Sequence, residues 1–392
     1  NLASINVWHF VKKNNSQRIQ FNWGELEKVV KIATRFLDNV IDVNKYPLKQ
    51  IEEMTLNTRK IGLGIMGLGD LLYEFKIPYN SKEGLKFMER LIEFISYYSK
   101  ITSMELSKER GRMPYFDKSF YKEGKLPFSG FKDKKSWHFD WLKLAKDIKR
   151  YGIRNSYTTV IAPTGSISMI AGCSSGIEPV YSLVFEKNVV IGNFYYIDPV
   201  FDEQMHEEGL MDEALIKDVA ALSGSVQKLS YIPEKLKKIF VTALDITPKE
   251  HIRALAAFQK WVDSSISKTN NFPAEAVVDD IKEAYLLAYE LGCKGVTVYR
   301  DTALKKQVLV GGGAKKKQED KGKLVTIKDE KVKGLTVYHE AGVGEGKSLG
   351  LSPAPESLGI EDGIKNCPVC NTKLVRQEGC NKCPTCGWGL CL

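Results

Sequence analysis

The stretch RNSYTTVIAPTGSIS at residues 154–168 joins a short strand pattern to a loop rich in hydroxyl groups. Residues 157–162 are typical of a β-strand, which ends at a proline. The residues that follow are Pro163, Thr164, Gly165, Ser166, Ile167 and Ser168. Backbone N–H groups and hydroxyls grouped in this way can bind a phosphate. The stretch therefore predicts a phosphate-binding loop at the end of a strand, although an ordinary strand-to-turn segment would show the same pattern.

Helix and strand patterns alternate around this stretch, through residues 1 to about 304, as in an α/β domain. The cap residues and apolar spacings predict three helices: Ser81 to Gly111, Thr247 to about Ile266 with Glu250 completing a capping box, and one that ends at Gly292. A strand pattern at 296–299 follows the third helix directly, which predicts half of a βαβ unit. Glu178, in GCSSGIEP after the loop, is a candidate base or hydrogen-bond acceptor, although a capped turn is the interpretation that we favour.

Composition and charge limit the class of protein. Of the 392 residues, 43% are hydrophobic and 27% charged, which excludes a wholly disordered or fibrous chain. The sequence contains no apolar run long enough to cross a membrane and no signal-peptide pattern, so we expect a cytoplasmic protein. The net charge of +9 favours anionic ligands such as nucleotides. Because the chain begins with Asn1 rather than Met, we expect a processed product or part of a longer polypeptide.

The stretch GLGIMG at 62–67 matches the G-x-G-x-x-G pattern of dinucleotide-binding proteins. Its context differs from that motif, because no apolar strand pattern precedes it, and Glu83 and Glu89 belong to the next predicted helix. Close packing of helices through small residues is the interpretation that we favour for these glycines.

Six of the eight cysteines lie near the end of the chain, after a segment at 305–365 rich in Gly, Ser, Pro and Lys. This segment predicts a flexible linker with a short strand at 335–338. The CPVC and CPTC pairs beyond it have the spacing of a zinc ribbon. The candidate metal ligands are Cys367, Cys370, Cys380, Cys383 and Cys386. Closely spaced thiols also exchange with disulfides, so one pair can instead be redox active.

Several separated segments resemble the C-terminal half of the large catalytic chain of ribonucleotide reductases, specifically the adenosylcobalamin-dependent class II enzymes. They are NLASIN at 1–6, RKIGLGIMGLGDLL at 59–72, IPYNS at 77–81, the loop stretch at 154–168, SSGIEPVY at 174–181, HIRALAAFQKWVDSSISKT at 251–269 and LGCKGVTVYRD at 291–301. The resemblance implies that residues 1–304 supply the later part of a ten-stranded α/β barrel. It also implies that the loop at 163–168 binds the diphosphate of a ribonucleoside diphosphate substrate.

The resemblance further implies how the radical arises. Relatives that import a radical from a separate metal subunit carry two adjacent tyrosines, whereas this sequence has Thr297 and Val298 there. A local source, adenosylcobalamin, is therefore implied. The family's thiyl radical forms on a cysteine in an Asn-x-Cys-x-Glu loop, and this sequence contains no such loop. We expect the chain to be inactive alone and to require an N-terminal partner, in an enzyme that is a homodimer when complete.

The tail at 366–392 fits the same resemblance, because class II chains end in thiols that carry electrons from a thioredoxin-like or other dithiol reductant. Cys386 and Cys391, or Cys383 and Cys386, are the candidate redox pairs. We favour zinc binding by Cys367, Cys370, Cys380 and either Cys383 or Cys386. Other classes stay open from the residues alone: a zinc-ribbon protein that binds nucleic acid, a NAD-dependent dehydrogenase, or an inactive relic that pairs with a complete reductase.

Overall fold

The computed structural model describes residues 1–13, 19–189, 192–301, 323–327, 336–341, 366, 373, 375–377, 380–382 and 389–391. The chain divides into two compact units, Asn1–Gly342 and Val343–Leu392. In the described residues, no helix is both long and apolar enough to cross a membrane.

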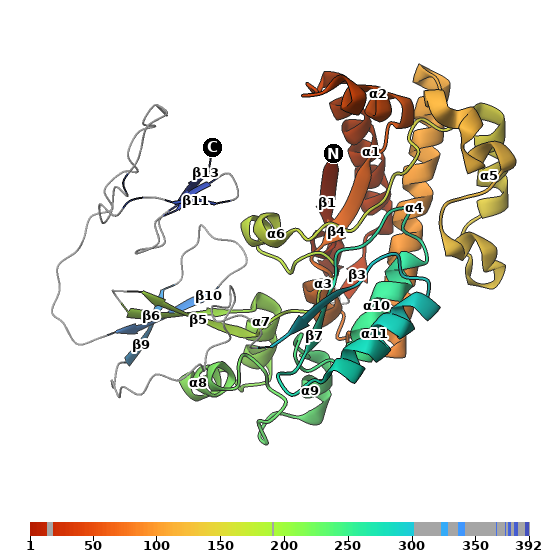
Figure 1. Ribbon diagram of the computed structural model, residues 1–392. Helices are drawn as coiled ribbons and strands as arrows, with labels where there is room; N and C mark the ends of the chain where they lie inside the picture. Colours follow the sequence, from red (N-terminus) through yellow and green to blue (C-terminus); the bar gives the residue numbers. More distant parts are fainter. Residues whose placement is uncertain are drawn as a thin grey trace. The chain divides into compact units, whose positions relative to one another are not determined.

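Parallel strands form the centre of the first unit. Strand β1 (Leu2–Asn6) pairs in parallel with β4 (Gly62–Met66), and the two lie side by side in Figure 1. The predicted strand at 157–162 lies on the other side of β4, where Leu63 bridges Thr159 in parallel. A further parallel bridge joins Ile161 to Ile266. The α/β class is thereby confirmed, whereas the ten-stranded barrel stays a prediction.

The glycines at 62–67 do not pack helices, so that interpretation is wrong. Gly62 and Gly64 lie within strand β4, and a Cβ atom on either would come too close to Val160 on the neighbouring segment. Gly67, at φ +81°, ends the strand and precedes helix α3 (Leu68–Glu74). The glycines therefore allow a close approach of two adjacent strand segments and a sharp turn.

The long helix α4 (Lys82–Arg110) confirms the prediction for that segment. The Ser81 side chain accepts a hydrogen bond from the N–H of Gly84 at 2.9 Å, and Gly111 follows the last turn. Helix α4 contacts α1 (Trp23–Val43), α5 (Trp141–Tyr151) and α10 (Pro248–Gln259). Apolar residues of these helices and of β1 and β4 share one core.

The predicted capping box is present at Thr247 and Glu250, at the start of α10. The helix ends at Gln259 rather than near Ile266, because the chain turns there to bridge the parallel segments. The side-chain amide of Gln259 donates to the carbonyl oxygens of Val262 and Ser264, at 3.3 and 2.9 Å. These two backbone oxygens of the turn therefore have hydrogen-bond donors.

The predicted βαβ unit is confirmed. Strand β7 (Thr269–Phe272), helix α11 (Val278–Glu290) and strand β8 (Thr297–Arg300) follow one another, and the two strands are parallel. The α11 residues Ala284 and Ala288 pack with Phe272 in a small core of their own.

A second layer of the same unit has a separate core. It contains β5 (Val184–Val189), β6 (Gly192–Ile197), α7 (Pro199–Glu207), α8 (Glu213–Ala221) and α9 (Glu234–Ile239). Strand β10 (Thr336–Ala341) pairs with β6 and with β9 (Lys323–Ile327), so the strand predicted at 335–338 is confirmed. These two strands lie within the range predicted as a linker, and the other residues of 305–365 lie outside the described residues.

The remaining elements of the first unit are short. They are 3-10 helices at Val7–Phe10, Pro114–Lys118, Phe120–Glu123, Ser129–Lys132 and Lys134–Ser136, strands β2 (Val11–Lys13) and β3 (Ile19–Phe21), and helices α2 (Lys49–Thr58) and α6 (Gly165–Ala171).

The second unit contains a three-stranded antiparallel sheet. Its strands are β11 (Val375–Gln377), β12 (Cys380–Lys382) and β13 (Gly389–Cys391). Cys380 and Cys391 are register partners in β12 and β13. Four of the predicted zinc or redox residues lie outside the described residues: Cys367, Cys370, Cys383 and Cys386.

Candidate functional site

The predicted phosphate-binding loop lies directly after the parallel segment 157–162, at its carboxyl end. Pro163 is exposed, and Thr164 is buried with a left-handed backbone, φ 57°. The Thr164 hydroxyl accepts a hydrogen bond from the N–H of Gly176 at 2.7 Å. A left-handed conformation is unfavourable for threonine, and this bond helps to stabilise it.

The two predicted serines have different surroundings. Ser168 is buried, and its hydroxyl lies 2.7 Å from the hydroxyl of Ser175. Ser166 is exposed, as are Gly165 and Ile167. The first N–H groups of a helix have no partner within it. The hydroxyl of Ser166 and the N–H groups beside it are thus available to a ligand, whereas Ser168 fixes the loop to the next segment.

Residues 173–178 follow α6 and form hydrogen bonds to the loop, and we call this segment the bracket. The turn from β4 to α3 is hydrogen-bonded to the first part of the bracket. The N–H of Ser174 donates to the Asp70 carboxylate at 2.7 Å, and the Ser174 hydroxyl accepts from the N–H of Gly69 at 3.0 Å. The Tyr79 hydroxyl donates to the carbonyl oxygen of Ile177 at 2.6 Å. The segment 69–79, far earlier in the sequence, therefore bonds the bracket at both Ser174 and Ile177.

Glu178, at the end of the bracket, is a hydrogen-bond acceptor, which was one of the two roles predicted for it. Its carboxylate accepts from the Lys268 ammonium at 2.7 Å and from the N–H of Thr269 at 2.6 Å. These bonds connect the bracket to strand β7.

Sequence reasoning missed Asp70 and Lys268 as part of this arrangement. Asp70 is buried, and burial raises its pKa, opposed by its bonds to Ser174. Burial also raises the pKa of Asp198, which caps α7, to about 8, with a further contribution from Asp70. For Lys268 the sequence offered one signal of a buried role: it is the one charged residue in SSISKT, a stretch otherwise made of hydroxyl and apolar residues.

Cys173 lies at the start of the bracket and is half-buried. Burial raises the pKa of its thiol to about 12, and the charge of Asp70 adds to this. A thiol with so high a pKa stays protonated at neutral pH and is a poor nucleophile.

Strand β8 contains the two positions at which the resemblance distinguishes classes. Thr297 pairs with Thr269 of β7, and Val298 pairs with Asn270. Thr297 is exposed and Val298 is half-buried. Neither side chain can carry a radical as tyrosine does.

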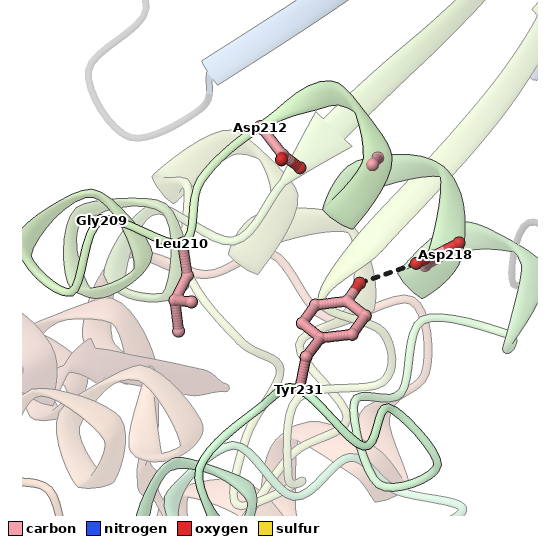
Figure 2. A pocket seen from close by; sticks show the side chains of 6 residues that line it. Gly209, Leu210, Asp212, Asp218 and Tyr231 are labelled. Carbon is pink, nitrogen blue, oxygen red and sulfur yellow. Dashed lines mark hydrogen bonds between the residues drawn. The ribbon is translucent and has the colours of Figure 1, made fainter.

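A pocket of about 300 Å³ lies in the second layer, lined by residues that include Gly209, Leu210 and Asp212 (Figure 2). The Tyr231 hydroxyl closes one side of it by donating to Asp218 at 2.7 Å. The loop residues 163–168 are not among the residues that line this pocket.

Among the residues that the structure describes, no group of three or more His, Cys, Asp and Glu side chains could hold a metal ion. The predicted zinc ligands are in the tail, where only the backbone of Cys380 and Cys391 is described, so zinc binding stays a prediction.

Comparison with known proteins gives a consistent family. Residues 1–299 match the family described as "Ribonucleotide reductase, barrel domain". The vitamin B12-dependent ribonucleoside-diphosphate reductase of Thermoplasma acidophilum is 41% identical over 328 residues, 83% of this chain and 39% of that protein. A protein of the same name from Mycobacterium tuberculosis is 35% identical over 316 residues, 80% and 41% of the respective chains. This chain spans about two fifths of the length of these relatives.

A solved structure supports the fold. The class Id ribonucleotide reductase alpha subunit of Actinobacillus ureae matches with a TM-score of 0.59 at 24% sequence identity. The match covers 77% of this chain and 49% of that one.

Proposed function

The chain belongs to the ribonucleotide reductase family, and we propose that it forms the part of such an enzyme that binds the diphosphate of a ribonucleoside diphosphate. The complete enzyme would reduce this substrate to the deoxyribonucleotide and so supply precursors for DNA synthesis. The loop at 163–168 carries the proposal: it lies at the carboxyl end of a parallel strand segment, where α/β proteins bind ligands. Its exposed Ser166 and backbone N–H groups suit a phosphate.

We propose that the radical chemistry takes place with the help of a second polypeptide segment. The sequence contains no Asn-x-Cys-x-Glu loop, and the relatives are more than twice as long as the part that matches. The partner would be the N-terminal part of the reductase, and the complete enzyme would be a homodimer.

We propose adenosylcobalamin as the cofactor. Both relatives have vitamin B12 in their names, and Thr297 and Val298 offer no tyrosine pair for an imported radical. The cofactor would supply a radical by homolysis of its cobalt–carbon bond. A corrin ring provides its own nitrogen ligands to cobalt, so this cofactor requires no metal-binding cluster from the described residues.

We propose that residues 366–392 form a zinc-stabilised redox tail that follows the predicted linker range 305–365, part of which is occupied by strands β9 and β10. Four of the five candidate ligands named above would hold zinc, with the CPVC and CPTC pairs as the main support. Cys386 and Cys391 are the proposed redox thiols, re-reduced by a thioredoxin-like protein or another dithiol.

The test of this function is reconstitution. Ribonucleoside diphosphate reduction is measured with this chain alone and with the chain mixed with the N-terminal part of a B12-dependent relative, in the presence of adenosylcobalamin and a dithiol. We expect deoxyribonucleotide only from the mixture. Product from the chain alone would contradict the assignment of the radical loop to a partner, and no product from a verified complex would contradict the proposed function.

Replacing both Ser166 and Ser168 by alanine is expected to weaken the binding of inorganic pyrophosphate. Ser166 would lose a hydroxyl available to the ligand, and Ser168 would lose its bond to Ser175. Each lost hydrogen bond costs about 0.5–1.5 kcal/mol. Isothermal titration measures the affinity, with Ser136→Ala, a serine bonded only within its own turn, as the control. An affinity equal to that of the control would remove the loop from the site.

A further inference from the structure

We propose that Lys268 is a positioning residue for the phosphate-binding loop: it fixes Glu178, and through Glu178 the bracket at 173–178 that supports the loop. This inference rests on the proposed function of the loop. The hydrogen bonds of Lys268 go to Glu178, His251 and Thr269 and not to the loop, so its effect would be transmitted through the bracket.

The ammonium group of Lys268 has no access to solvent, because its side chain is 0% exposed. It donates to the Glu178 carboxylate at 2.7 Å, to the His251 ring at 3.0 Å and to the carbonyl oxygen of Thr269 at 3.2 Å. An ammonium has three donors. All three are therefore used, and each bond fixes the position of the group.

His251 acts as a neutral acceptor in this arrangement. Its Nε2 donates to the carbonyl oxygen of Ala243 at 2.9 Å, which leaves the lone pair of Nδ1 for Lys268. Burial, and then the charge of Lys268, lower the pKa of His251 to about 2. Among the residues that the structure describes, Glu178 is the one carboxylate bonded to the buried ammonium.

Glu178 transmits this constraint to the loop. One of its carboxylate oxygens bonds Lys268, and the other accepts from the N–H of Thr269, so the carboxylate cannot rotate without losing a bond. Two residues before it in the bracket, the N–H of Gly176 donates to the Thr164 hydroxyl. This bond holds the left-handed backbone of Thr164 at the start of the loop.

Such an ion pair is poorly suited to stability alone. Burying two charges costs free energy that their attraction only partly recovers, and an apolar pair of the same size is often as stable. What the ion pair adds over an apolar contact is direction, because hydrogen bonds fix Glu178 relative to β7. A loop that binds phosphate through several donors depends on such fixed geometry.

The test is the variant Lys268→Met in the full chain, with inorganic pyrophosphate as the ligand in isothermal titration. We expect the affinity to fall roughly three- to tenfold, the equivalent of about one lost hydrogen bond. Lys260→Met is the matched control, because Lys260 bonds Glu89 and Asp133 and no residue of the bracket. A lysine with a merely structural role would lower the melting temperature and leave the affinity unchanged, which would overturn the proposal.

Glu178→Gln provides a second and milder variant. Its amide oxygen still accepts from Thr269, but the charge opposite Lys268 is lost. We expect the same three- to tenfold loss, and no further loss in the double variant, because both residues act through one contact. Additive losses, or wild-type affinity in folded Glu178→Gln, would overturn the proposal, and this variant decides if Lys268→Met fails to fold.

The outcomes separate this inference from the proposed function. If the wild-type chain does not bind pyrophosphate, the loop assignment fails and the role of Lys268 fails with it. If the wild-type chain binds and both variants bind equally well, only the role of Lys268 fails.

Discussion

Replacing Lys100 by methionine is expected to lower the free energy of unfolding by about 3–5 kcal/mol, the usual cost of removing one partner from a buried ion pair. The Lys100 ammonium bonds the carboxylate of Asp263, and both side chains are 0% exposed. The same carboxylate oxygen accepts from the N–H of Thr158 at 2.6 Å. The variant would leave the carboxylate of Asp263 buried without its bonded ammonium, because the neighbouring Lys294 donates to the backbone oxygen of Asp263 and not to its carboxylate.

Urea denaturation measures this effect, and two further variants make it specific. Lys108→Met, on the same helix, removes an exposed lysine that lies 4.0 Å from the centre of the Tyr151 ring, and it should cost less than about 1 kcal/mol. The double variant Lys100→Met/Asp263→Asn should recover part of the loss, because it buries no unpaired charge. A loss in Lys100→Met no greater than that in Lys108→Met would show that the pair contributes nothing.

Local signals in the sequence were sufficient for the helix starts. Ser81 and Thr247 bond to N–H groups only three residues further on, so the pattern of a few neighbouring residues determines the cap. The end of α10 was predicted seven residues too late, at Ile266 instead of Gln259. The apolar spacing continues past the turn, because Ile266 is buried in the same core from the parallel segments.

Contacts between distant segments explain what the sequence did not reveal. The interpretation of the glycines depended on the identity of their neighbour, and Val160 is almost a hundred residues away from Gly64. The buried ions Asp70, Lys268 and Asp263 were likewise invisible, since each has its partner far along the chain.

The candidate loop was predicted as six residues, and the structure divides them into two groups. Pro163, Gly165, Ser166 and Ile167 are exposed, whereas Thr164 and Ser168 are buried and bond the bracket. The sequence gives both serines the same chemistry. Only the position of Ser175 relative to Ser168 determines which hydroxyl supports the loop and which is available to a ligand.

Replacing Gly64 by alanine is expected to cost about 1–3 kcal/mol of stability, the usual range for an extra methyl group in a packed interior. The new Cβ atom would lie well inside 3.0 Å of the carbonyl oxygen of Val160. That segment cannot move away freely, because the N–H of Val160 donates to Leu63 at 3.1 Å and Leu63 donates to Thr158 at 2.8 Å. Relief of the clash would break these bonds between the two segments.

The same substitution at Gly24 is the matched control. Gly24 is exposed within helix α1, and the nearest atom to an added Cβ, the Asn22 side-chain oxygen, is 3.9 Å away, so alanine there should stabilise the chain by about 0.5–1 kcal/mol. The two variants thus differ in sign, which urea denaturation resolves. Val160 lies three residues before Pro163, so Gly64→Ala should also weaken pyrophosphate binding, whereas Gly24→Ala should not. Equal stability of the two variants would mean that β4 and its neighbour do not approach as closely as the structure places them.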